Sequence, residues 1–191
     1  MRVIAGEFRG MKLFVPKGDD IRPTTDRARE DIFNILSPYI AGCTFLDLFA
    51  GTGAAGIEAV SRGAAKSVFV DNSQKSIELI RQNIQKTKRS ENFEFFKSDA
   101  LKYLHETIHS YDIIFLDPPY NFRDCEKIIS LICSRNLLNR GGAVAAEQGR
   151  EPQLPETIGN LSLFRKKLYS SSAVYFYKEN SIENSFLSGE L

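Results

Sequence analysis

The sequence has few cysteines, few histidines, no long apolar run and almost no net charge, and each shortage excludes a class of protein. Its three cysteines, with no C-x-x-C spacing, cannot supply a disulfide framework or a thiolate metal site. No apolar run approaches the roughly 20 residues of a transmembrane helix, and the start lacks the apolar core of a signal peptide. We therefore expect a reduced, cytoplasmic protein without a membrane anchor.

The composition is that of one globular domain. Of 191 residues, 42% are hydrophobic and 26% are charged, which suffices for a continuous core. A net charge of +1 gives no bulk attraction to nucleic acid, although local clusters can still supply one. We expect an N-terminal extension over residues 1–40, a main domain over 41–178, a polar tail over 179–191, and by default a monomer.

The N-terminal extension combines two local patterns. Residues 2–15 alternate apolar and polar positions around Gly6 and Gly10, which predicts a short hairpin. A helix is expected to follow, with Thr25 as its N-cap and Pro38 as its end.

From residue 44 the chain alternates strand-like and helix-like segments, which predicts an α/β fold with a mostly parallel sheet and helices on both faces. Two closing runs, 161–168 and 172–178, predict a terminal antiparallel pair, making seven strands with an antiparallel last strand. The other strands are expected near 44–48, 67–71, 93–97, 112–117 and 142–147, and the helices near 54–62, 74–88, 100–108 and 124–138.

A glycine-rich turn follows the first of these strands. Gly51, Gly53 and Gly56 form a G-x-G-x-x-G spacing between strand and helix, where the backbone can approach a ligand closely. The pattern alone is weak, because nicotinamide and flavin dinucleotides use similar turns and some such turns bind nothing. Asp47, just before this turn, would repel a pyrophosphate and attract a cation.

Aspartates stand at the ends of four successive parallel strands, where an open α/β sheet binds its ligands. Asp71, about 20 residues after Gly51, suits ribose hydroxyls, and Asp99 suits an adenine amino group, although aspartate there is also a common helix N-cap. Together with Asp47 and Asp117, these carboxylates favour a positively charged nucleoside. S-adenosylmethionine has adenine, ribose and a sulfonium cation, and it fits.

The tetrad Asp117-Pro118-Pro119-Tyr120 predicts a site for a planar amino group. The two prolines fix the backbone, so the Asp117 carboxylate and neighbouring carbonyls gain defined directions as acceptors. Tyr120 can stack on the ring that carries the amino group. A strand followed by an ordinary proline turn is the simpler alternative.

Two further patterns carry less weight. His105 and His109 match H-E-x-x-H, but the chain has no third histidine, so we expect a solvated helix face and no metal. Basic residues near the N-terminus are candidates for contacts with nucleic-acid phosphates, and a solvated basic face is the alternative. These residues are Arg2, Arg9, Lys12, Arg22, Arg27 and Arg29; Arg165, Lys166 and Lys167 form a weaker late cluster.

These motifs together resemble the RsmD-type methyltransferases, which methylate the exocyclic N2 of a guanine in bacterial small-subunit (16S) ribosomal RNA. The resemblance covers nearly the whole chain and is carried by residues 1–10, 22–30, 46–56 and 116–120. It implies a class I methyltransferase fold in a domain over 41–178, with S-adenosylmethionine as cofactor and ribosomal RNA, free or in a 30S particle, as partner. It implies cofactor contacts at Asp47, Phe49, Gly51, Gly53, Asp71, Asp99 and Asp117, and an amino-group site at Asp117, Pro118, Pro119 and Tyr120.

The chain departs from the family pattern in one place, and several functions stay open. Tyr169-Ser170-Ser171-Ser172 stands where the family typically has Tyr-Gly-x-Thr, which affects the edge loop but not the transfer chemistry. D-P-P-Y also occurs in DNA amino-methyltransferases, so DNA adenine N6 or a protein amide is an alternative substrate. A nicotinamide oxidoreductase and a non-catalytic RNA-binding assembly factor are more remote alternatives.

Overall fold

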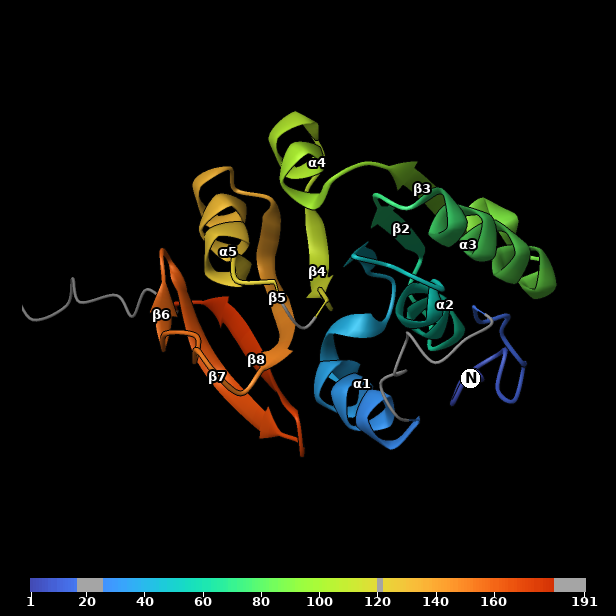
Figure 1. Ribbon diagram of the computed structural model, residues 1–191, viewed down its shortest axis with the longest axis horizontal. Coiled ribbons are helices and arrows are strands. Elements are labelled where there is room, and N and C mark those ends of the chain that lie inside the picture. The colour runs from blue at the N-terminus through green and yellow to red at the C-terminus, as the bar shows by residue number, and fades with distance from the viewer. Residues whose placement is uncertain (17–25, 120–121, 181–191) are drawn as a thin grey trace, which may run out of the picture.

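A computed structural model describes residues 1–16, 26–119 and 122–180. Figure 1 shows a sheet that runs from β3 at one end to β6 at the other, with helices packed on it. The elements in chain order are α1 (Asp26–Ile40), β1 (Thr44–Leu48), α2 (Ala54–Ser61), β2 (Lys66–Asp71), α3 (Gln74–Thr87), a 3₁₀ turn (Ser90–Asn92), β3 (Phe93–Lys97), α4 (Ala100–Glu106), β4 (Tyr111–Leu116), α5 (Cys125–Ser134), β5 (Leu138–Gly149), β6 (Thr157–Ile158), β7 (Leu161–Leu168) and β8 (Ser172–Glu179).

The sheet has the strand order β3-β2-β1-β4-β5-β8-β7-β6. The first five strands pair in parallel, whereas β8 pairs antiparallel with both β5 and β7. The chain builds outward from β1 to β3 and then crosses to β4, so the strand order reverses between β1 and β4. In open α/β sheets, the crevice at such a reversal is where ligands bind.

Helices cover both faces of the sheet, as the alternating pattern predicts. On one face, side chains of α1, α2 and α3 pack in a cluster that includes Phe33, Ile57 and Ile80. On the other face, α4 and α5 contribute Leu104 and Ile129 to a second cluster. The strands β1, β2 and β4 are buried on both sides of the sheet, whereas the edge strand β3 is largely exposed.

Four expectations about element boundaries need correction. α1 continues through Pro38 to the buried Ile40, because packing on the sheet outweighs the one helical bond that proline removes. α5 ends at Ser134 because Asn136 adopts a left-handed φ of 52°, which caps the helix and frees residue 138 to start β5. The described residues form eight strands, because the two-residue β6 adds to the seven expected. The expected hairpin is a fold-back with a single bridge, Arg2 to Lys12.

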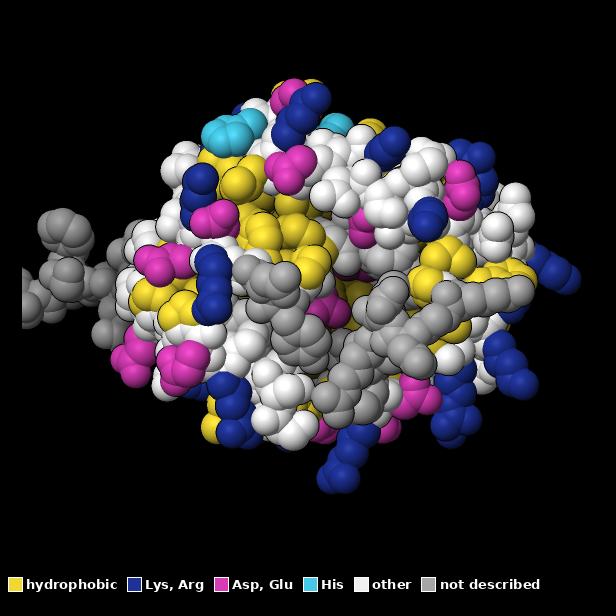
Figure 2. Space-filling model, viewed as in Figure 1, with side chains coloured by type: hydrophobic (Ala, Val, Ile, Leu, Met, Phe, Trp, Pro, Cys, Tyr) yellow, Lys and Arg dark blue, Asp and Glu magenta, His cyan; other side chains and the backbone are white. Residues whose placement is uncertain are grey.

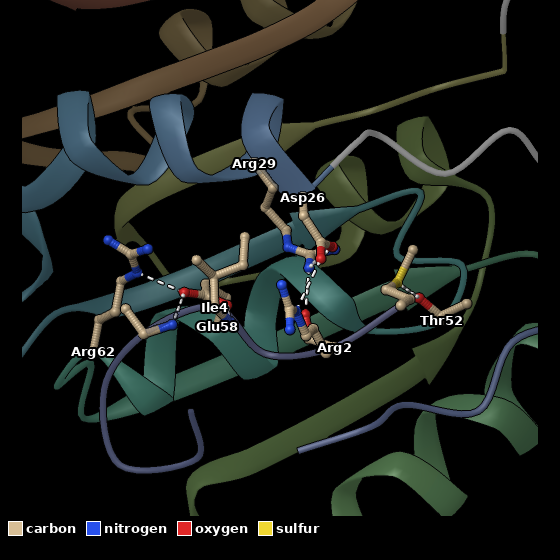
Figure 3. A network of polar contacts seen from close by, with 9 residues as sticks. Arg2, Ile4, Asp26, Arg29, Thr52, Glu58 and Arg62 are labelled. Atoms are coloured by element: carbon tan, nitrogen blue, oxygen red, sulfur yellow. Dashed lines mark hydrogen bonds and ion pairs between the residues drawn. The ribbon is translucent and has the colours of Figure 1, made fainter. Parts of the chain in front are cut away.

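The N-terminal segment, residues 1–14, is bonded directly to the helix that follows the glycine turn. The buried carboxylate of Glu58 on α2 accepts from the backbone amides of Ile4, at 2.7 Å, and Ala5, at 3.0 Å, and from Arg62 at 2.7 Å. Figure 3 shows Glu58 between Ile4 and Arg62. Because each of these bonds uses buried or partly buried groups, the segment is held at a fixed position on α2.

A second anchor links the same segment to the glycine turn itself. Asn83 on α3 is fully buried; its side chain accepts from Phe14 N at 2.7 Å and donates to Phe14 O at 3.1 Å. The same amide donates to Thr52 O at 2.9 Å. The N-terminal segment and the glycine turn are therefore held by one side chain.

Gly6 and Gly10 form a matched pair that tests this docking. Both are left-handed, with φ of 80° and 82°, but an added Cβ at Gly6 would lie 1.7 Å from Ser61 O, whereas at Gly10 nothing lies within 4 Å. Gly10→Ala is expected to cost about 1–2 kcal/mol of backbone strain, and Gly6→Ala clearly more, about 3 kcal/mol. Denaturant unfolding of both variants measures the difference; equal costs would contradict the docking of this segment on α2.

Within the described part of the chain, we find no helix with the length and apolar character needed to cross a membrane.

Candidate active site

Asp47 and Asp117 stand on the two strands between which the strand order reverses. Asp47 lies on β1 and Asp117 follows β4 directly, with Leu48 opposite Leu116 in the register. The Asp117 amide lies 3.5 Å from Leu48 O, which continues the pairing of the two strands to their ends. Both residues therefore lie near the carboxyl ends of neighbouring strands, at the edge where open α/β sheets have their ligand crevice.

The glycine turn shapes the wall of this crevice. Gly51 and Gly53 have left-handed φ values of 54° and 77°, and Gly53 is the N-cap of α2. Gly51 has open space on its Cβ side, with only Phe49 O at 3.9 Å. Gly56 serves packing instead, because a Cβ there would lie 2.2 Å from the Phe69 ring. The first two glycines thus form the turn, and the third lets α2 approach β2.

Asp71 and Asp99 lie at the ends of β2 and β3 in different surroundings. Asp71 is half-buried and its two oxygens accept from Gly51 N and Ser73 N, both at 2.8 Å, so it ties the glycine turn to the start of α3. Asp99 is exposed and caps α4, accepting from Lys102 N at 3.1 Å. Asp99 is therefore a helix N-cap, which was one of the two roles that the sequence allowed for it. Because a carboxylate has further lone pairs, Asp71 and Asp99 can both accept additional hydrogen bonds.

Asp47 is a buried carboxylate that accepts a hydrogen bond from the helix after the glycine turn. It is 2% exposed and accepts from Gly56 N at 3.1 Å. Burial raises its pKa well above 3.8, the Gly56 hydrogen bond opposes this, and the charges of Asp117 and Asp71 raise it further. Three carboxylates close enough to repel one another make this crevice strongly favourable for a cation.

Phe49 and the Asp117-Pro118-Pro119 segment directly follow the neighbouring strands β1 and β4. Asp117 is half-buried, Pro118 is buried and Pro119 is exposed. Phe49 has a left-handed φ of 66°, which is strained for a phenylalanine, and its ring meets that of Phe122 edge-on with centroids 5.0 Å apart. Such strain is kept where the surroundings determine it, and it occurs at ligand sites. Tyr120 lies outside the described residues.

Cys125, the nearest thiol to this segment, is no candidate nucleophile. It is fully buried on α5. Burial, and then the charges of Asp124 and Asp117, raise the pKa of its thiol to about 12. The thiol is protonated at neutral pH, and the reactive thiolate is essentially absent.

The basic residues near the N-terminus divide into two groups. Arg9, Lys12 and Arg27 are exposed, and the side chain of Arg2 is 66% exposed beside Asp26. Arg29 differs from the expected phosphate contact, because it is 4% exposed and its guanidinium bonds to Arg2 O and Asp26. Figure 2 shows lysines and arginines around the margin of the viewed face, interspersed with acidic side chains. Arg22 lies outside the described residues.

The two histidines do not share a helical face. α4 ends at Glu106, so His105 lies in its last turn and His109 lies beyond it. The one-turn spacing that zinc coordination requires is therefore missing. Among residues 1–16, 26–119 and 122–180, we find no group of three metal-binding side chains.

Sequence reasoning missed Glu147 and Phe122, although both lie near this site. Glu147 is buried at the carboxyl end of β5, beside the end of β4. It follows an apolar strand, as Asp117 does, and that signal could have identified it. Phe122 gave no signal in advance, because its contact with Phe49 joins residues far apart in the chain.

The fold and the acidic edge of the sheet define the class of protein. The chain is a class I S-adenosylmethionine-dependent methyltransferase, a class whose features include a sheet with an antiparallel last strand, a glycine turn after β1 and acidic side chains at the strand ends. The family model described as "Conserved hypothetical protein 95" matches residues 1–178. The chain belongs to this family, which contains the RsmD and YlbH proteins.

Individual relatives match over most of their length. The Bacillus subtilis (strain 168) protein named "Putative rRNA methyltransferase YlbH" is 39% identical over 94% of this chain and 99% of its own. "Ribosomal RNA small subunit methyltransferase D" of Haemophilus influenzae is 37% identical over 87% of this chain and 88% of its own. The structure of "Putative methyltransferase yhhF" from Escherichia coli superposes with a TM-score of 0.85, at 35% identity over 94% of this chain and 98% of that chain.

Proposed function

We propose that this methyltransferase transfers a methyl group from S-adenosylmethionine to the exocyclic N2 of a guanine in small-subunit (16S) ribosomal RNA. The observation that carries the proposal is that the buried carboxylate of Asp47, whose pKa is raised by burial and by the charges of Asp117 and Asp71, lies on the strand paired with the one that leads into the Asp-Pro-Pro segment. The carboxylates suit a sulfonium cation and the segment suits an amino group. The Haemophilus influenzae relative, named for small-subunit rRNA, supports the choice of substrate.

The cofactor contacts are assigned to the residues of the crevice wall. Gly51 and Gly53 let the cofactor approach the backbone, Asp47 faces its charged end, and Asp71 accepts from the ribose hydroxyls. Phe49 borders the same space, Asp99 accepts from the adenine amino group, and Asp117 contacts both cofactor and substrate. When bound, S-adenosylmethionine supplies an activated methyl group next to a good leaving group.

The protein's part in the transfer is to hold the guanine amino group correctly. Its nitrogen shares a lone pair with the ring, so Asp117 and the Pro118 carbonyl accept its hydrogens and turn the lone pair toward the methyl carbon. With S-adenosylmethionine bound, N2 would take the methyl group as the carbon–sulfur bond breaks, S-adenosylhomocysteine would leave, and the proton lost from N2 would pass to water. Asp117 stabilises the positive charge that develops on nitrogen, and positioning supplies much of the rate.

We assign the remaining predicted residues to contacts with the RNA substrate. Tyr120 would stack on the target base, which gains about 1–3 kcal/mol. Arg2, Arg9, Lys12, Arg22 and Arg27 would contact phosphates. Of these, Arg2, Arg9 and Lys12 belong to the segment over residues 1–14 that is bonded to α2 and α3. We propose residues 1–40 as a substrate-binding extension of the domain over 41–178, in a cytoplasmic monomer.

Gly51→Ala is expected to weaken cofactor binding about tenfold, because its Cβ would project into the open side of the turn. Gly42→Ala is the matched control, since Gly42 is also left-handed, with φ of 72°, has nothing within 4 Å, and precedes β1 at its other end. Isothermal titration calorimetry with S-adenosylmethionine measures both. Equal affinity in the two variants would contradict the cofactor position.

The experiment that tests the substrate class is transfer of tritiated methyl groups to three acceptors. Small ribosomal subunits from a strain lacking its own enzyme, duplex DNA and a soluble protein extract are offered at equal mass. We expect label in the ribosomal RNA alone. Label in DNA would favour adenine N6 methylation, label in protein an amide substrate, and tight cofactor binding without transfer a non-catalytic RNA-binding role; each result would overturn the proposal.

A further inference from the structure

Glu147 is a buried carboxylate directly beside the Asp-Pro-Pro segment. In the β4–β5 register, Leu116 lies opposite Ala146. Asp117, the residue after β4, and Glu147 on β5 therefore occupy the next positions along the two chains, and neighbouring strands are spaced about 4.8 Å apart. Glu147 is 9% exposed, although it lies at the carboxyl edge of the sheet where the crevice opens. Figure 1 shows β4 and β5 side by side.

The side of the sheet that Glu147 faces is fixed by the alternation of β5. Ala146 packs with the α4 and α5 cluster and Ala145 with the α1, α2 and α3 cluster, so Glu147 points to the same face as Ala145. Asp47 also faces that side, because Gly56 of α2 donates to its carboxylate. Glu147 thus shares the face on which we place the transfer.

The orientation of Glu147 is set by the turn between β7 and β8. Ser172 Oγ donates to Glu147 Oε1 at 2.7 Å, and both residues are buried. Tyr169 closes the turn with a bond from its amide to Ser172 O at 2.9 Å, and its hydroxyl donates to Ala28 O of α1 at 3.3 Å. This is the turn in which the chain departs from the family pattern, and it retains a hydroxyl at its fourth position.

We infer that Glu147 is the residue that selects guanine. The inference rests on the proposed function: if N2 is the methyl acceptor, the base enters with its Watson–Crick edge toward the carboxyl ends of β4 and β5. That edge of guanine carries two adjacent kinds of donor, N1–H and the N2 amino group, which match the neighbouring carboxylates of Glu147 and Asp117. Glu147 accepts from N1–H, while Asp117 and the Pro118 carbonyl accept the two N2 hydrogens.

The same geometry rejects adenine. Adenine presents an N1 lone pair where guanine presents N1–H, so it would face the Glu147 carboxylate with an acceptor against an acceptor. A site built to hydrogen-bond a donor discriminates strongly against a base that presents an acceptor at that position, because the two acceptors repel each other. One carboxylate therefore explains how an amino-group site shared with adenine methylation becomes specific for guanine.

The test compares Glu147→Gln with the wild type and with Glu156→Gln, which neutralises an exposed glutamate. Glutamine keeps the shape and can still accept from Ser172, but its amide nitrogen cannot accept from guanine. We expect kcat for N2-methylguanosine formation on small subunits to fall about 100-fold or more in Glu147→Gln. The Kd for S-adenosylmethionine and the Tm should stay at the wild-type values, and Glu156→Gln should match the wild type throughout.

The outcomes separate this inference from the proposed function. A full rate in Glu147→Gln, with the wild type producing N2-methylguanosine, would overturn the role of Glu147 and leave the proposed function standing. A variant whose Tm and cofactor affinity fall together with kcat would show a structural role and would also overturn it. If the wild type produced no N2-methylguanosine, the proposed function itself would be overturned, together with the inferred role of Glu147 in selecting guanine.

Discussion

Asp117→Asn is expected to lower kcat for methyl transfer to small ribosomal subunits by about 10²- to 10³-fold. The amide cannot stabilise the positive charge that develops on N2, and one of its two polar atoms donates instead of accepting. S-adenosylmethionine should still bind within about tenfold of the wild-type Kd, since Asp47, Asp71 and the glycine turn are unchanged. Single-turnover transfer and calorimetry measure the two quantities separately.

Asp124→Asn is the matched control for this substitution. Asp124 precedes α5 as its N-cap residue, is exposed, and its side chain makes no capping hydrogen bond to the helix amides. It should transfer methyl groups at the wild-type rate. If Asp117→Asn retained more than about half of the wild-type kcat, the amino-group site would have to lie elsewhere.

Asp47→Asn is expected to have opposite effects on stability and on cofactor affinity. The asparagine oxygen can still accept from Gly56 N, but the buried negative charge is gone. Without a cation, burial and the charges of Asp117 and Asp71 disfavour the ionised carboxylate, so the ligand-free variant should have a higher Tm than the wild type at pH values above the raised pKa. With a cationic ligand the charge is favourable, so affinity for S-adenosylmethionine should fall about 10- to 100-fold.

The pH dependence of stability follows from the direction of the Asp47 pKa shift. Its pKa in the folded protein lies well above 3.8, so between those two values the folded state holds a proton that the unfolded chain has released. This contribution to stability is complete below the unfolded pKa and is lost as the pH rises through the folded pKa. Denaturant unfolding across this window should show a falling contribution in the wild type and a flatter curve in Asp47→Asn. The same slope in both proteins would contradict the raised pKa.

Cofactor affinity should show the reverse dependence on pH. Binding of a sulfonium favours the ionised form of Asp47, so complex formation releases a proton and strengthens as the pH rises through the raised pKa. Calorimetry in buffers of different ionisation enthalpy measures the proton release. Asp47→Asn should release fewer protons; equal release in both proteins would place the cofactor charge away from Asp47.

The parallel part of the sheet could be predicted from the sequence, because apolar strand-like runs alternate with helix-like segments and each pattern is local. Strands such as Thr44–Leu48 and Phe93–Lys97 lie where the alternation of apolar runs and helices puts them. The misplaced boundaries depend on tertiary packing. Pro38 stays helical because Ile40 is buried beyond it, and the two-residue β6 has no periodicity of its own and exists through its pairing with β7.

The candidate site is predictable to the extent that it lies at strand ends. The topology alone brings Asp47 and Asp117 to the two strands at which the order reverses. The basic composition of the N-terminal region did not predict the burial of Arg29. Its guanidinium bonds to Asp26 and to Arg2 O instead of facing solvent. Glu147 shows another limit: the apolar run before it could have marked it as a candidate, but its position beside Asp117 depends on the β4–β5 register.

The most direct test of this account is the identity of the methylated nucleoside. Small subunits from a strain lacking its own enzyme are incubated with the purified protein and S-adenosylmethionine, and the rRNA is digested and analysed by mass spectrometry. The account predicts a single new peak, N2-methylguanosine, that Asp117→Asn does not produce. A peak of N6-methyladenosine, or one that persists in Asp117→Asn, would contradict it.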